Sequence, residues 1–243
     1  PELFARLWLG SMPGLISGQS PDRNIFYSSY LSTYVERDVR ELSGSVDALK
    51  FNRFVTAVAA RCSQLLNYKA LADDADIDMP TAKNWVNILE TLGIIFLLHP
   101  YSNNVLKRTI KTPKVYFYDT GLVCYLTRWT SPEVAESGAM SGALLENFTV
   151  SEIMKSYQNA GLEPYLYFYR DRDAKEIDVI LEGDGKLCPL EIKKTATPDK
   201  RLTRVFSVMD RSPLQLGTGA VLCMAEQFGA FDRDNLIVPI WMI

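Results

Sequence analysis

Two acidic residues and a lysine are spaced along the chain so that a hairpin would bring them into one small volume. The segments Lys175–Glu182 and Leu187–Lys194 alternate like β-strands, and the Gly-Asp-Gly between them has the chemistry of a tight turn. Side chains two residues apart lie on one face of a strand, so Glu191 lies beside Lys193. With the register that we expect for this hairpin, Asp178 shares that face.

This arrangement suits a divalent cation. Two carboxylates about 4 Å apart repel by roughly 4 kcal/mol at an effective dielectric constant near 20, so a half-buried sheet holds them together more easily around a cation. Mg²⁺ or Mn²⁺ accepts one or two carboxylates together with water and phosphate oxygens. A neighbouring lysine can hold or deprotonate an attacking water, or offset charge on a phosphorane-like transition state. The alternative is an ordinary amphipathic hairpin whose charges lie on its solvated face.

A third carboxylate, Glu146, lies in the predicted helix Gly142–Ala160. Apolar residues recur there at helical spacing, and Glu146 falls among them instead of on the polar side. A helix with an inward glutamate, a strand with an aspartate and a strand with Glu-x-Lys resemble the PD-(D/E)XK nuclease superfamily. The matching residues are Glu146, Asp178, Glu191 and Lys193, with Ile177 where the superfamily's name has proline.

The resemblance implies roles for these residues. Asp178 and Glu191 would ligate Mg²⁺ or Mn²⁺, and the carbonyl of Ile192 is a further candidate ligand. Glu146 would bind through the metal or a water, and Lys193 would activate the attacking water. Arg170 and Lys194 are candidate phosphate contacts at the rim of the site.

Composition limits the other chemistries. The chain has 243 residues, 47% of them hydrophobic and 23% charged, as in soluble globular proteins. No apolar run approaches the roughly 18 residues of a membrane span, and no signal peptide is visible. Four scattered cysteines indicate reduced thiols in a cytoplasmic protein. His99 is the only histidine, which argues against Ser-His-Asp, Cys-His and multi-histidine metal sites.

The net charge and the identity of the first residue lead to two further expectations, about DNA binding and about the length of the parent protein. The net charge of −3 and the pI near 5.4 argue against non-specific coating of DNA, although a local basic face is compatible with them. Residue 1 is a proline, so we expect the chain to be part of a longer protein.

Residues 49–130 are predicted to form a winged helix-turn-helix domain. The expected elements are helices over Phe51–Ser63, Tyr68–Ala75 and Met79–Thr91 and a strand over Ile94–Leu98. Asp78 is expected to cap the third helix and Gly93 to end it. Residues 1–48 precede this domain as a helical linker or the remnant of an ATPase lid.

The winged helix-turn-helix domain offers candidate contacts to nucleic acid, most simply DNA. The exposed face of its third helix carries Lys83, Asn84 and Asn87. The expected wing has no acidic residue and contributes Lys107, Arg108 and Lys111, which suit phosphate contacts. The alternative is that the domain docks a protein or acts as a rigid linker.

Residues 138–243 are predicted to form a mixed-sheet domain after a polar boundary at residues 131–138. The element order is expected to be α-β-β-β-α-β-β, which is typical of the restriction-endonuclease-like fold. The strands are placed at Tyr165–Arg170, Glu176–Leu181, Leu187–Lys193, Gly219–Met224 and Leu236–Trp241, and the second helix at Asp199–Asp210. The chain as a whole is therefore assigned to the α/β class, α+β overall.

Over nearly its full length the chain resembles the C-terminal region of bacterial and archaeal AAA-type P-loop ATPases that end in a domain of unknown function with a PD-(D/E)XK-like fold. The residues that carry the resemblance are Gly10–Gly14, Tyr34–Asp38, Lys107, Arg108, Lys114–Gly121, Leu145–Phe148, Tyr169, Arg170, Glu176–Asp178 and Glu191–Lys193. The resemblance implies an upstream ATPase domain in the same polypeptide. These 243 residues contain no Gly-x₄-Gly-Lys-Ser/Thr motif, so ATP is assigned to that domain.

Three functions are compatible with the sequence. The first is a metal-dependent phosphodiesterase of nuclease type acting on DNA. The second is a non-catalytic module of an ATPase that binds DNA or protein, with a nuclease-like fold that is only structural. The third, a pure transcription regulator, explains the winged helix but leaves the last hundred residues without a role.

Overall fold

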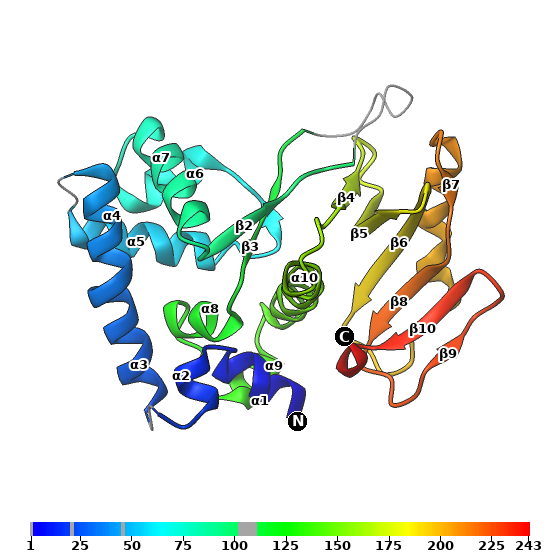
Figure 1. Ribbon diagram of the computed structural model, residues 1–243, viewed down its shortest axis with the longest axis horizontal. Coiled ribbons are helices and arrows are strands. Elements are labelled where there is room, and N and C mark those ends of the chain that lie inside the picture. Colours follow the sequence, from blue (N-terminus) through cyan, green and yellow to red (C-terminus); the bar gives the residue numbers. More distant parts are fainter. Residues whose placement is uncertain (1, 20–21, 45–46, 102–110) are drawn as a thin grey trace. The chain divides into compact units, whose positions relative to one another are not determined.

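The computed structural model describes residues 2–19, 22–44, 47–101 and 111–243 (Figure 1). The chain forms two compact units. The first consists of Pro1–Leu97 and Val115–Phe148, and the second of Leu98–Lys114 and Thr149–Ile243. Helices and strands are combined in an α/β fold, which confirms the fold class expected from the sequence.

The first unit begins with helices α1 (Glu2–Leu9) and α2 (Pro13–Ile16). A longer helical path then runs through α3 (Arg23–Ser29), the π-helix η1 (Tyr30–Val35) and α4 (Glu36–Ser43). Neither proline nor glycine interrupts this path. Its middle contains the wider i→i+5 turn of a π-helix, a rare geometry that often marks functional sites.

The next elements of the first unit combine helices with a small sheet. Helices α5 (Ala48–Ala59), α6 (Tyr68–Ala75) and α7 (Met79–Thr91) are joined by strands β1 (Gln64–Leu65), β2 (Ile95–Leu98) and β3 (Lys114–Phe117) in the order β1-β3-β2. The Asp78 carboxylate caps α7 by accepting the Thr81 N–H at 2.8 Å, and Gly93 follows the helix at φ 65°. Both features agree with the sequence-based expectation.

Asp119 joins three separate segments of the first unit. Its carboxylate accepts hydrogen bonds from the Ser11 N–H at 2.6 Å, from the Tyr27 hydroxyl at 2.7 Å and from the Leu122 N–H at 2.7 Å. The last of these caps helix α8 (Thr120–Leu126), which precedes α9 (Pro132–Ser137). A Cβ atom on Gly121 would lie 2.2 Å from the Tyr27 hydroxyl, so this joint requires glycine. Packing at this joint therefore accounts for Asp119 and Gly121 within the family-like segment Lys114–Gly121.

Helix α10 (Ser141–Asn159) carries the chain from the first unit into the second. The strands that follow are β4 (Leu166–Arg170), β5 (Glu176–Gly183), β6 (Lys186–Lys193), β7 (Gln215–Leu216), β8 (Gly219–Cys223), β9 (Gly229–Ala230) and β10 (Asn235–Pro239). They form one sheet in the order β4-β5-β6-β8-β10-β9, with β7 paired to β6 (Figure 1). The first three strands are antiparallel, whereas β6, β8 and β10 are parallel.

The predicted helix after β6 forms, but as a 3₁₀-helix, η2 (Lys200–Arg211). Its buried residues are Thr203, Phe206 and Met209, each three positions from the next. A three-residue period matches the three residues per turn of a 3₁₀-helix, which explains why this geometry packs against the sheet. A second, short 3₁₀-helix, η3 (Ile240–Met242), follows β10. No helix in the described ranges is long and apolar enough to cross a membrane.

Candidate active site

The hairpin β5–β6 has the register that the candidate site requires. The pairs run from Gly183 opposite Lys186 to Val179 opposite Leu190. Asp184 and Gly185 have positive φ angles of 50° and 71°, as both central residues of a type I′ turn must. Continuing the register by one residue places Asp178 opposite Glu191.

The structure brings Asp178, Glu191 and Lys193 together in the second unit. The Lys193 ammonium lies 2.6 Å from Glu191 Oε1 and 3.3 Å from Asp178 Oδ2. The Ile192 N–H donates to the same Asp178 oxygen at 2.8 Å. Asp178 is 6% exposed and Glu191 8%, whereas Lys193 is half-buried. Two buried carboxylates therefore share a single ammonium.

This sharing leaves the cluster short of positive charge. Burial, together with the nearby Asp178 carboxylate, raises the pKa of Glu191 to about 7, although Lys193 opposes the shift. Burial alone would lower the pKa of Lys193, but the two carboxylates outweigh it and the pKa is raised. Oε2 of Glu191 is buried and accepts no hydrogen bond from the part of the chain that the structure describes. An unsatisfied carboxylate oxygen of this kind fits a cation.

A metal at this position would rest on few protein ligands. No group of three or more His, Cys, Asp or Glu side chains among the described residues is arranged to hold a metal ion. Two carboxylates are nevertheless sufficient for Mg²⁺, which keeps several waters. Asp178 and Glu191 are the residues that would hold it.

Glu146, the third predicted carboxylate, belongs to the first unit. Its Oε1 accepts a hydrogen bond from the Tyr116 hydroxyl at 2.6 Å. Its neighbour Asn147 is fully buried, accepts the Phe117 N–H and donates to the Phe117 carbonyl, both at 2.8 Å. The role of Glu146 in the metal site stays a prediction.

The structure adds an ion cluster that the sequence did not indicate. Lys114 is only 3% exposed, and its ammonium lies 2.5 Å from Glu176 Oε1 and 5.4 Å from the centre of the Phe168 ring. Arg170 contacts the other oxygen of Glu176 at 3.3 Å. Arg170 therefore stabilises a carboxylate of β5, in addition to any contact with phosphate. The only signal for this cluster was a lysine at the start of an otherwise apolar strand.

The predicted nucleic-acid contacts fall into three groups. Lys83, Asn84 and Asn87 are exposed on α7. Lys111 and Lys194 are also exposed. Lys107 and Arg108 lie outside the described residues.

The acidic end of α6 is partly neutralised by ion pairs. Asp74 pairs with Arg61 at 2.6 Å, and Asp76 pairs with Lys50 at 2.9 Å. These contacts reduce the repulsion that this acidic end would exert on a nucleic-acid backbone near α7.

Comparisons with known proteins identify the families but not an activity. The chain belongs to the family described as Domain of unknown function (DUF8612), which matches residues 1–133. Residues 141–243 match a second family, described as Domain of unknown function (DUF4143).

Two mycobacterial proteins are similar to most of the chain. They are named Uncharacterized protein Rv2008c, of Mycobacterium tuberculosis, and Uncharacterized protein Mb2031c, of Mycobacterium bovis. Each is 29% identical over 238 residues, covering 97% of this chain and 52% of the relative. The chain thus spans about half the length of these curated relatives. No solved structure matches it.

Proposed function

We propose that the second unit is a metal-dependent phosphodiesterase domain of nuclease type. The observation that carries this proposal is the buried, unpartnered Oε2 of Glu191 beside Asp178 and Lys193. The element order α10-β4-β5-β6-η2-β8 is compatible with the α-β-β-β-α-β order expected for the PD-(D/E)XK superfamily, which the sequence resembles. The site residues lie on the two strands where that superfamily carries its Asp and Glu-x-Lys residues.

The residues divide the chemistry between them. Bound Mg²⁺ or Mn²⁺ would polarise a phosphoryl oxygen and acidify a water. Asp178 and Glu191 would hold the ion, and the Ile192 N–H fixes the orientation of the Asp178 carboxylate. Because the pKa of Lys193 is raised, its amine is an ammonium at neutral pH. It therefore orients the attacking water or stabilises negative charge on the phosphoryl oxygens, and it does not act as the base.

The first unit supplies the proposed contact with nucleic acid. The order α5-β1-α6-α7-β2-β3 and the sheet order β1-β3-β2 support a winged helix-turn-helix assignment. The exposed Lys83, Asn84 and Asn87 lie on α7, the helix that would serve as the recognition helix. The strands β2 and β3 flank the segment in which the wing is predicted.

The wider context is also a proposal. The chain spans about half of its curated relatives, which is compatible with an ATPase domain elsewhere in the same polypeptide. In that arrangement ATP belongs to the other domain, and the chain acts in the cytoplasm as the DNA-directed part of an AAA-type ATPase.

The alternative function is a non-catalytic interaction module of such an ATPase. One observation favours it: the Lys193 ammonium already bridges both carboxylates, as in a purely structural ion cluster. The two functions differ in whether the cluster accepts a divalent ion and whether nucleic acid is then cut.

The deciding experiment is a calorimetric titration of the 243-residue chain with Mn²⁺. We expect one site with a dissociation constant near millimolar or tighter, and its loss in Asp178→Asn. Asp184→Asn is the matched control, because it removes the same charge in the hairpin turn, where asparagine keeps the favoured conformation. Equal Mn²⁺ binding by wild type and Asp178→Asn would refute the site. Binding without cleavage of any DNA or RNA substrate would select the alternative.

A further inference from the structure

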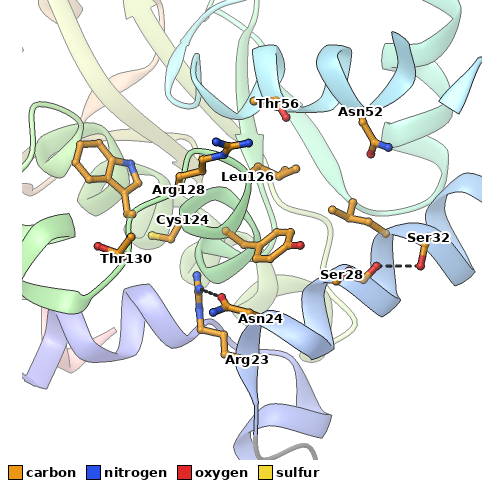
Figure 2. Close-up of a pocket in the computed structure, with 13 residues that line it drawn as sticks. Arg23, Asn24, Ser28, Ser32, Asn52, Thr56, Cys124, Leu126, Arg128 and Thr130 are labelled. Carbon is orange, nitrogen blue, oxygen red and sulfur yellow. Dashed lines mark hydrogen bonds between the residues drawn. The ribbon is translucent and has the colours of Figure 1, made fainter. Parts of the chain in front are cut away.

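A cavity in the first unit has a lining that suits an anionic ligand. Its volume is about 630 Å³, within the range of small-molecule sites. Figure 2 shows side chains that surround it from α3, α5 and the region of α8. The lining residues are Arg23, Asn24, Ser28, Leu31, Ser32, Asn52, Thr56, Cys124, Tyr125, Leu126, Arg128, Trp129 and Thr130. Two are arginines, six are small hydroxyl or amide residues, and none is acidic.

Hydrogen bonds to uncharged groups hold the Arg23 guanidinium beside this cavity. The residue is 8% exposed, and its guanidinium donates to the Trp8 carbonyl at 2.8 Å, the Gly121 carbonyl at 2.8 Å and Asn24 Oδ1 at 3.3 Å. It also lies 4.2 Å from the centre of the Trp8 ring. No carboxylate of the described chain forms an ion pair with it. Burial lowers the pKa of Arg23, although nearby groups that include the Asp119 carboxylate oppose the shift. A guanidinium stays charged in proteins, so an incoming anion that contacts it directly would add to this compensation.

Two neighbouring residues supply further donors without partners. Arg128 forms no ion pair with an acidic residue in the described ranges. Its backbone has a left-handed φ of 60° just after α8, at a position where glycine is usually preferred. The left-handed conformation is sterically unfavourable for a residue other than glycine. The indole Nε1 of Trp129 is buried and donates to no acceptor in the described structure. An arginine with a left-handed backbone and a tryptophan whose buried N–H has no acceptor among the described residues are both lining residues of this cavity.

The remaining wall contains the π-helix. Leu31 and Ser32 of η1 line the cavity, and the Ser32 hydroxyl donates to the Ser28 carbonyl at 3.0 Å. Asn52 and Thr56 from α5 complete the polar side. A π-turn within an otherwise α-helical path is often retained where it shapes a site.

We propose that this cavity binds a small organic phosphate whose hydroxylated body, such as a ribose, contacts the hydroxyl and amide side chains. Arg23 and Arg128 provide the positive charge, and the Trp129 N–H provides a directed donor. The cavity is separate from the hairpin that carries Asp178 and Glu191, and its ligand does not depend on the metal site.

The variant Arg128→Gly tests the proposal without threatening the fold. Glycine adopts the left-handed conformation without strain, so the variant should melt at the same temperature as wild type or higher. Loss of a charged contact should weaken ligand binding roughly 10- to 100-fold. Lys69→Ala is the control, because it removes an exposed charge of the same unit and should leave binding unchanged. Alanine is used here because residue 69 lies within α6, where glycine would destabilise the helix.

The probes are adenosine monophosphate, ribose 5-phosphate, adenosine and inorganic phosphate, titrated by calorimetry into the 243-residue chain. We expect one of the two organic phosphates to bind at least tenfold more tightly than adenosine or inorganic phosphate. Trp129→Phe, which removes the N–H donor and keeps an aromatic ring, should weaken the binding of the organic phosphate. Equal binding of inorganic phosphate, unchanged binding by Arg128→Gly, or binding of a single-stranded oligonucleotide without either organic phosphate would overturn the proposal. These titrations contain no Mn²⁺, so a negative result for the organic phosphates does not bear on the proposed metal site.

Discussion

The Lys193 ammonium and the Glu191 carboxylate lie 2.6 Å apart on the same face of β6. Both side chains belong to one strand, so this contact follows from the two-residue period of the strand. Asp178 reaches the same ammonium from β5, at 3.3 Å. The geometry therefore concentrates two negative charges and one positive charge where the two strands face each other.

We expect Lys193→Ala to reduce metal-dependent cleavage by about 10²–10³-fold, the usual effect of removing one group that stabilises charge at a reacting centre. The measurement is the initial rate of DNA cleavage in Mn²⁺. Lys186→Ala is the control, because Lys186 is an exposed lysine at the opposite end of the same strand. Wild-type rates for Lys193→Ala, or equal losses in both variants, would contradict the assignment.

Glu191 should make stability depend on pH. Its pKa is raised from 4.5 to about 7 by burial and by Asp178, so the folded state holds this proton more tightly than the unfolded state. Its contribution to stability is present below pH 4.5 and is lost as the pH rises to about 7. At roughly 1.4 kcal/mol per pKa unit, the loss is at most about 3.5 kcal/mol.

Glu191→Gln removes this titration. The free energy of unfolding of the variant minus that of wild type should therefore increase from pH 5 to pH 8, in buffer containing EDTA. The measurement is urea denaturation at several pH values. A difference that stays constant over this range would show that Glu191 titrates normally.

The sequence predicted the local parts of this architecture well. The hairpin register follows from a two-residue turn that Asp184 and Gly185 can adopt, and the cap of α7 follows from Asp78. Such features depend on neighbouring residues, which the sequence displays directly. The convergence of Asp178, Glu191 and Lys193 was predictable because only one turn separates their strands.

Features that depend on distant packing were missed. The burial of Lys114 arises from Glu176, which is 62 positions away, and no local pattern indicates that pair. The 3₁₀ geometry of η2 is set by which side chains reach the sheet, and the helical pattern alone favoured an α-helix. The cavity beside Arg23 combines α3, α5 and α8, so its lining appears only in three dimensions.

The pair formed by Lys114 and Glu176 should stabilise the second unit. Lys114→Met leaves Glu176 with only Arg170, and we expect a loss of roughly 2 kcal/mol, below the 3–5 kcal/mol typical of a fully broken buried pair. This loss of stability is measured by hydrogen exchange of the β5 and β6 amides. Lys175→Met, an exposed neighbour, should have little effect. The double variant Lys114→Met/Glu176→Gln should recover part of the protection against hydrogen exchange. If it recovers none, the Lys114–Glu176 pair is not the source of the stabilisation.

Asn147 should be a major stabilising residue of the first unit. Its fully buried amide makes two hydrogen bonds to the backbone of Phe117, and Asn147→Ala would leave the Phe117 N–H and carbonyl unsatisfied. We expect a loss of about 2–4 kcal/mol. Three of the four tryptophans, at positions 8, 85 and 129, lie in this unit, so fluorescence during urea denaturation reports it. Asn159→Ala, at the exposed end of α10, is the control.

The exposed face of α7 should account for nucleic-acid binding if the winged-helix proposal is correct. Lys83→Glu reverses a charge on this face, and a lysine that contacts phosphate contributes about one unit to the dependence of log affinity on log salt. We therefore expect weaker binding of a DNA duplex at low salt and a salt slope smaller by about one. Fluorescence anisotropy at several salt concentrations measures both quantities.

Lys186→Glu is the matched control for Lys83→Glu, because it changes the net charge by the same amount through an exposed lysine in the second unit. A long-range effect of net charge would weaken both variants equally and leave the salt slopes alike. A local contact on α7 would lower the slope only for Lys83→Glu. Identical behaviour of the two variants would therefore remove α7 from the nucleic-acid interface, while leaving the metal site on β5 and β6 to be judged by its own titration.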